Sequence, residues 1–208
     1  MAERPEEQEQ EMTISKVSRR ELRSMLRRWR LLDLDAWESL GCLFTLSTGI
    51  PEIRLYDSVI NLGLREQIED TAIEAAQLLA SELETGEGFL ISDGHWPRSE
   101  ALNEESFLVE IVAASGITRA FGGAIKIGHL SAAQIQQLME EVTKGALHAR
   151  FDCGIVVRTS RCPIIWNPCH HADVHVFTDG SRKIVDKIRH PAHASGLLVN
   201  EEHCVDGE

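Results

Sequence analysis

The sequence predicts an α/β protein in which a mixed sheet is flanked by helices, preceded by a small helical N-terminal unit. Amphipathic helical patterns alternate with short apolar runs, as in proteins that pack helices on a sheet. The longest apolar runs, Gly88 to Ser92 and Gly154 to Val157, have the length of strands. The 208 residues, of which 43% are hydrophobic and 26% charged, suit one core with an appendage.

The first fifty residues predict a tail and a helical unit. Residues 1–14 contain five Glu and no periodic apolar pattern, so we expect a disordered acidic tail. Residues 15–50 predict the helical N-terminal unit. Its first helix starts at Ser18, which has capping-box spacing to Glu21, and its apolar residues recur at helical intervals. Residues 33–46 predict a second helix.

The remaining chain, residues 57–203, predicts alternating helices and strands. We expect helices over 57–84, 131–147 and 184–195. We expect strands over 89–91, 122–127, 151–157, 163–166, 173–177 and 196–199. Residues 107–114 fit either a helix or a strand. Residues 163–166 are expected to pair with the preceding strand across a turn.

The charge of the chain excludes some partners. The net charge is −12, which disfavours binding to DNA or RNA phosphates, so we expect no nucleic-acid partner. Residues 16–30 are an exception, with seven basic residues and one acidic residue, a local charge of +6. We interpret this segment as a solvated basic helix face, which could also pair with the acidic tail.

The sequence favours a cytoplasmic protein without a membrane span. Its N-terminus is acidic and polar, unlike a signal peptide, and no run of 18 apolar residues occurs. The cysteine count is odd, so thiols are expected rather than a disulfide framework. The five cysteines are Cys42, Cys153, Cys162, Cys169 and Cys204.

A group of zinc-type ligands lies between residues 162 and 175. Its members are Cys162, Cys169, His170, His171 and His175. Their spacing fits no common structural zinc module, and adjacent histidines on a strand point to opposite faces. A zinc site and a set of buried thiols with polar loop histidines are both open interpretations.

Two other segments carry residues suited to a nucleotide. In the first, Asp152 starts a strand and is followed by the small residues Cys153 and Gly154, which lets a nucleotide or a metal approach the backbone. In the second, Arg189 and His190 are expected to open a helix whose next residues are small, which is typical of an anion site. Asp152 and Arg189 are 37 residues apart, which leaves room for two or three strands between them.

These two segments, in this order, resemble the diadenylate cyclase domain, the nucleotide-binding domain of DNA-integrity scanning proteins, and look most like its archaeal type. That family carries Asp-Gly-Ala on a strand and Arg-His-Arg opening a later helix. The helix that begins at Leu64, the strand ending in Ser92-Asp93-Gly94, and the helix before Asp152 also resemble the family. The resemblance covers residues 57–203.

The resemblance implies an enzyme that converts two ATP molecules to cyclic di-AMP and pyrophosphate. Two domains would face each other, each with one ATP, so a homo-oligomer is implied. Asp152 would bind Mn²⁺ or Mg²⁺ and help to activate the ribose 3′-hydroxyl, which attacks the α-phosphate of the opposite ATP. The implied nucleotide-binding residues are Cys153, Gly154, Lys187, Arg189, His190 and His193.

Both motifs depart from the family pattern. Asp-Gly-Ala is replaced by Asp152-Cys153-Gly154, and Arg-His-Arg by Arg189-His190-Pro191, which removes one cation. Lys187 or His193 would have to replace that charge. Two further hypotheses therefore stand beside the cyclase. One is a catalytically degenerate domain of the same type that senses a nucleotide. The other is a zinc-supported interaction protein.

Overall fold

The computed structural model describes residues 12–36, 38–47, 61–81, 86–92, 96, 106–117, 121–147, 153–158, 163–169, 173–180 and 182–202. In chain order, its elements are β1 (Thr13–Val17), α1 (Arg19–Arg28), β2 (Leu32–Asp33), β3 (Glu38–Ser39), β4 (Cys42–Ser47), α2 (Asn61–Ser81), β5 (Gly86–Ser92), α3 (Phe107–Ser115), β6 (Ala124–Leu130), α4 (Ala132–Leu147), β7 (Cys153–Arg158), β8 (Pro163–Pro168), β9 (Asp173–Thr178), α5 (Arg182–Ala194) and β10 (Leu198–Glu202).

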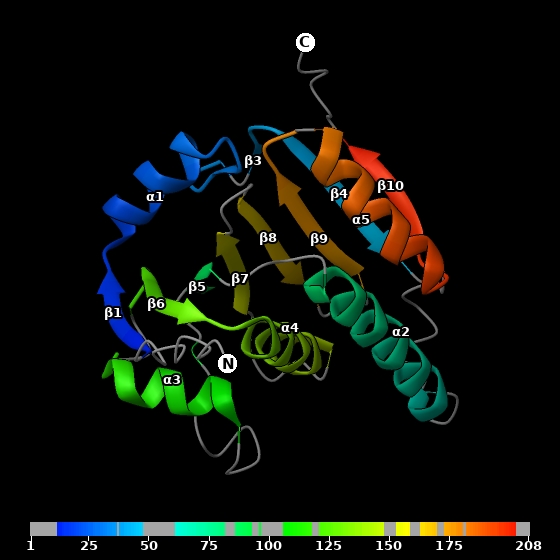
Figure 1. The fold of residues 1–208 in the computed structure, drawn as a ribbon, viewed down its shortest axis with the longest axis horizontal. Coiled ribbons are helices and arrows are strands. Elements are labelled where there is room, and N and C mark those ends of the chain that lie inside the picture. Colours follow the sequence, from blue (N-terminus) through cyan, green and yellow to red (C-terminus); the bar gives the residue numbers. More distant parts are fainter. Residues whose placement is uncertain are drawn as a thin grey trace, which may run out of the picture.

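Eight strands form one sheet in the order β1-β6-β5-β7-β8-β9-β4-β10, with β1 at one edge and β10 at the other (Figure 1). The α/β class is as predicted. The prediction that the sheet contains both parallel and antiparallel strands is wrong. Every pairing between the described strands of this sheet is antiparallel. The four residues between β7 and β8 and the four between β8 and β9 are too few for the crossover that parallel neighbours require.

The two faces of the sheet are covered by different elements. Leu90, Ile155 and Trp166 face one side, where they join a core with apolar residues of α2, α3, α4 and α5. Phe89, Val156 and Ile165, the neighbours of those residues in sequence, face the other side and pack with apolar residues of α1 and β2. The alternation follows from the period of two in strands. The protein therefore has a layered architecture with the sheet in the middle.

The N-terminal segment differs most from its prediction. Thr13 and Ile14, expected in the disordered tail, begin strand β1, which pairs with β6. The helix expected over 33–46 is wrong, because β2, β3 and β4 occupy this range. Strand β4 lies between β9 and β10 in the main sheet. The described residues between 15 and 47 thus contain one helix, and two of their strands belong to the same sheet as the strands of the C-terminal half.

Other predictions are confirmed. Ser18 caps α1 in a full capping box, with its hydroxyl accepting from the Glu21 amide and the Glu21 carboxylate accepting from the Ser18 amide. Helices α2 and α4 lie within their expected ranges. Residues 107–115, for which the sequence left a helix and a strand open, are helical. Strand β8 pairs with β7, as expected. None of the helices in the described ranges is both long and apolar enough to cross a membrane.

A charged cluster on the sheet lies beside α1. Glu87 on β5 accepts from Lys126 at 2.7 Å and pairs with Arg158 at 3.3 Å. The Lys126 ammonium lies 5.9 Å from the centre of the Phe89 ring, and the Arg158 guanidinium lies 5.4 Å from the centre of the Trp29 ring. The hydrogen bond from Lys126, with its charge and that of Arg158, lowers the pKa of Glu87.

We expect this cluster to make folding stability depend on pH. The pKa of Glu87 is lowered on folding, so its contribution is present above the ordinary value of 4.5 and is lost as pH falls through the folded pKa. Urea unfolding between about pH 6 and pH 3 should therefore show a smaller pH dependence in Glu87→Gln than in the wild type. Equal pH dependence in the two proteins would contradict the assignment.

Candidate functional site

The first candidate segment begins at the amino-terminal end of β7. Asp152 lies outside the described residues; Cys153, the next residue, is the first of the strand. The Cys153 side chain is 1% exposed and packs in the core on the side of α2 to α5. Its side chain is enclosed by protein, so only the backbone of Cys153 is left for contact with a nucleotide. Gly154 faces the opposite side of the sheet.

Gly154 is required by a close neighbour rather than by an unusual backbone conformation. A Cβ atom built on it would lie 2.7 Å from Asn167 Oδ1 and 3.3 Å from Ile91 Cγ1. The missing side chain thus lets Asn167, from β8, lie over the backbone of β7. Gly154 therefore contributes to the site by leaving space for the Asn167 side chain.

Asn167 belongs to a row of polar residues that runs across β8, β9 and β4. In register, Asn167 on β8 is paired with His175 on β9, and His175 with Thr45 on β4. Thr45 Oγ1 and His175 Nδ1 are 3.5 Å apart. We call Gly154, Asn167, His175 and Thr45 the polar row. Its three side chains are half-buried and present amide, imidazole and hydroxyl groups, which both donate and accept hydrogen bonds.

The polar row lies at the border of the layer formed by α1 and β2. Ile165 and Phe177, two residues away on β8 and β9, are buried in the cluster under α1. The apolar layer of α1 and β2 therefore covers the sheet up to Ile165 and Phe177. The next residues on this face are those of the polar row. On this face the side chains thus change from apolar under that layer to polar beyond it, as on the solvated face of an antiparallel sheet.

The second candidate segment does not open a helix, which corrects the prediction. Helix α5 begins at Arg182, so Arg189 and His190 lie in its middle, where the backbone amides are bonded within the helix. The Arg189 guanidinium donates to Glu201 on β10 and lies 3.8 Å from Asp186. The positive charge of Arg189 is thus balanced by two carboxylates. His190 and His193 are exposed, and Lys187 lies on the same helix.

The structure does not bring the two candidate segments together within one chain. Helix α5 packs on β10 and α2. Strands β8, β9 and β4 separate β7 from β10. Four strand spacings of about 4.8 Å correspond to roughly 19 Å. A single phosphate group therefore cannot contact both Gly154 and Arg189 of the same chain.

Only part of the Cys- and His-rich stretch falls within the described residues. Cys162, His170 and His171 lie outside them. Cys169 follows β8, and its amide donates to the Asp173 carbonyl at 2.8 Å, while His175 belongs to the polar row. Among the side chains that the structure describes, no group of three Cys, His, Asp or Glu is arranged to hold a metal ion.

The polar row was missed in the sequence because its members come from distant segments. His175 was considered only as a metal ligand, and Thr45 was placed in a helix. One signal was available, since Asn167 follows three apolar residues within the same strand. A polar residue in such a run indicates either an edge or a functional face. No protein-family model, curated protein or solved structure matches this chain.

Proposed function

We propose that the chain is a nucleotide-binding domain of the diadenylate cyclase type, in which the cyclase chemistry is reduced or lost. The observation that carries this choice is the state of Arg189. The resemblance assigns this cation to the phosphates, yet in this chain it is held by Glu201 and Asp186. With Pro191 in place of the third motif residue, the phosphate clamp of the family is weakened twice.

The nucleotide would bind at the amino-terminal end of β7, against the polar row. Asn167, His175 and Thr45 would hydrogen-bond the polar groups of the ligand. Mg²⁺ and Mn²⁺ prefer oxygen ligands, and Mg²⁺ sites commonly combine one or two carboxylates with substrate phosphates. Asp152 supplies the carboxylate in sequence, and Asn167 adds an amide oxygen beside Gly154. This donor set fits a cation that arrives with the nucleotide.

The proposal is tested by thermal unfolding with ATP and Mn²⁺. At about 100 times the Kd, binding to the folded state alone adds about 2.7 kcal/mol, which corresponds to a rise in Tm of roughly 5–10 °C. Asn167→Ala and His175→Ala should lose most of this rise. Gln67→Ala removes an exposed side-chain amide on α2, away from the polar row, and is the matched control, with the rise retained. If neither ATP nor cyclic di-AMP changes the wild-type Tm, the proposal is wrong.

The active cyclase is the second candidate, favoured by one observation. Strand β7 starts directly after Asp152, and the resemblance implies a strand for the Asp-Gly-Ala motif. In that case Arg189 and His190 would act from a facing second chain. Mass spectrometry of the protein incubated with ATP and Mn²⁺ distinguishes the active cyclase from the binding domain. Cyclic di-AMP that disappears in both Asp152→Asn and Arg189→Ala would establish the enzyme, whereas nucleotide binding that survives Arg189→Ala without any product supports the binding domain.

A further inference from the structure

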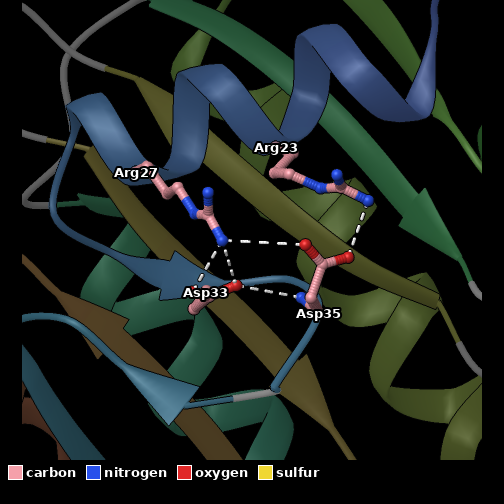
Figure 2. A network of polar contacts seen from close by, with 4 residues as sticks. All are labelled: Arg23, Arg27, Asp33 and Asp35. Atoms are coloured by element: carbon pink, nitrogen blue, oxygen red, sulfur yellow. Dashed lines mark hydrogen bonds and ion pairs between the residues drawn. The ribbon is translucent and has the colours of Figure 1, made fainter.

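Helix α1 presents arginines that have no ion-pair partner in the described part of the chain. Figure 2 shows that Arg23 and Arg27 are held by Asp35 and Asp33, with distances of 2.6 and 2.9 Å. The arginines without such a partner are all exposed: Arg19, Arg20 and Arg28 on the helix, and Arg30 in the turn that follows it. Arg20 and Arg28 are eight residues apart and thus lie on the same side of the helix.

Helix α2 carries the opposite charge in the same spacing. Glu66, Asp70 and Glu74 follow one another at intervals of four residues, and all three are exposed. None of them has an ion-pair partner within the residues the structure describes. Between Glu66 and Ala80 the chain contains no Lys or Arg. Like charges at this interval repel each other, so the acidic stripe is unfavourable unless a cationic surface lies against it.

The two helices cannot neutralise each other within one chain. Apolar residues of α1 are buried on one face of the sheet and those of α2 on the other. The ribbon shows the two helices well apart (Figure 1). The distance from Arg20 to Arg28 and from Glu66 to Glu74 is the same, about 12 Å along each helix. Leu78, which is 37% exposed, continues the acidic stripe by one turn and adds an apolar contact surface.

We propose that α1 of one copy docks on α2 of a second copy, in a head-to-tail arrangement. The face of α1 that carries Arg20 and Arg28 then contacts the acidic stripe Glu66, Asp70 and Glu74 of the neighbouring molecule. The net charge of −12 opposes approach at long range, but at about 0.1 M salt the Debye length is about 10 Å, so the local complementarity acts at contact. Because the two surfaces differ, a docked pair keeps one unused α1 surface and one unused α2 surface, and the assembly grows unless its rotation forms a ring.

Sedimentation velocity of the full chain at about 0.1 M and about 1 M salt tests this. At the lower salt we expect a mass above that of the monomer that increases with protein concentration. At about 1 M the Debye length falls to about 3 Å, and we expect the monomer. A monomer at all concentrations in the lower salt would overturn the proposal, and so would an assembly that persists unchanged in the higher salt.

Charge reversals identify the surfaces. Arg20→Glu with Arg28→Glu should give a monomer, and Asp70→Lys with Glu74→Lys should also give a monomer. When the two variants are mixed, the intact α1 of one faces the intact α2 of the other, and the two reversed surfaces are complementary as well, so assembly with the variants in a 1:1 ratio should return. This rescue excludes misfolding as the reason for lost assembly. Lys144→Glu reverses an exposed charge on α4 and should assemble like the wild type. Assembly of either double variant alone would overturn the proposal.

Discussion

Gly41→Ala is expected to destabilise the protein by more than about 3 kcal/mol, because the site is already occupied by backbone. A Cβ atom on Gly41 would lie 2.1 Å from the Thr178 carbonyl oxygen and 2.7 Å from that of Arg30. These atoms belong to the end of β9 and to the turn after α1, so neither can rotate away as a side chain would. The backbone would have to shift where the α1 layer meets the sheet.

Urea or thermal unfolding measures this effect. A loss of about 3 kcal/mol lowers Tm by roughly 6–12 °C in a chain of this size. The matched control is Gly122→Ala, where a Cβ would meet only the Arg19 guanidinium at 3.4 Å, the far end of a flexible side chain. We expect Gly122→Ala to stay within about 0.5 kcal/mol of the wild type. Equal stabilities of the two variants would show that the close approach at Gly41 is absent.

Glu141→Ala is the second substitution with a large expected effect, about 2–4 kcal/mol. Glu141 lies on α4, and its carboxylate accepts from the backbone amides of Leu108 at 2.7 Å and Phe107 at 3.2 Å. It also accepts from the Ser106 hydroxyl at 2.8 Å. These amides belong to the first turn of α3, where no carbonyl of the helix itself is available to them. The carboxylate thus joins α3 to α4 and complements the positive end of the α3 dipole.

The neighbouring residue supplies the control for Glu141. Glu140 accepts from the amides of Gln77 and Gln136, and a neutral amide is easily solvated when its partner is removed. Glu140→Ala should therefore cost less than about 1 kcal/mol. Amide hydrogen exchange adds a local readout, since the amides of Phe107 and Leu108 should lose protection in Glu141→Ala before the rest of the chain. Protection equal to that of the wild type would contradict the capping role.

The elements that the sequence predicted correctly are those with strong local signals. Helix α1 begins with a capping box that is complete within four residues. Strands β7, β8 and β9 are apolar runs separated by short connections, which favours antiparallel hairpins. Residues 33–46 were misassigned because Leu34, Trp37 and Leu40 recur at helical spacing. That segment is extended because β4 finds partners in β9 and β10, more than 120 residues away in the chain.

Some features of the candidate site could likewise be predicted from local sequence patterns, and others could not. Local patterns in the sequence were enough to predict that Asp152 precedes a strand of small and apolar residues and that residues 16–30 form a basic helix. Which side chains come together depends on the packing of the whole chain. The pairing of four strands places Thr45, His175, Asn167 and Gly154 in one row. The packing of α5 on β10 brings Arg189 into an ion pair with Glu201. Strand register and helix packing are set by contacts between distant segments, which no local pattern encodes.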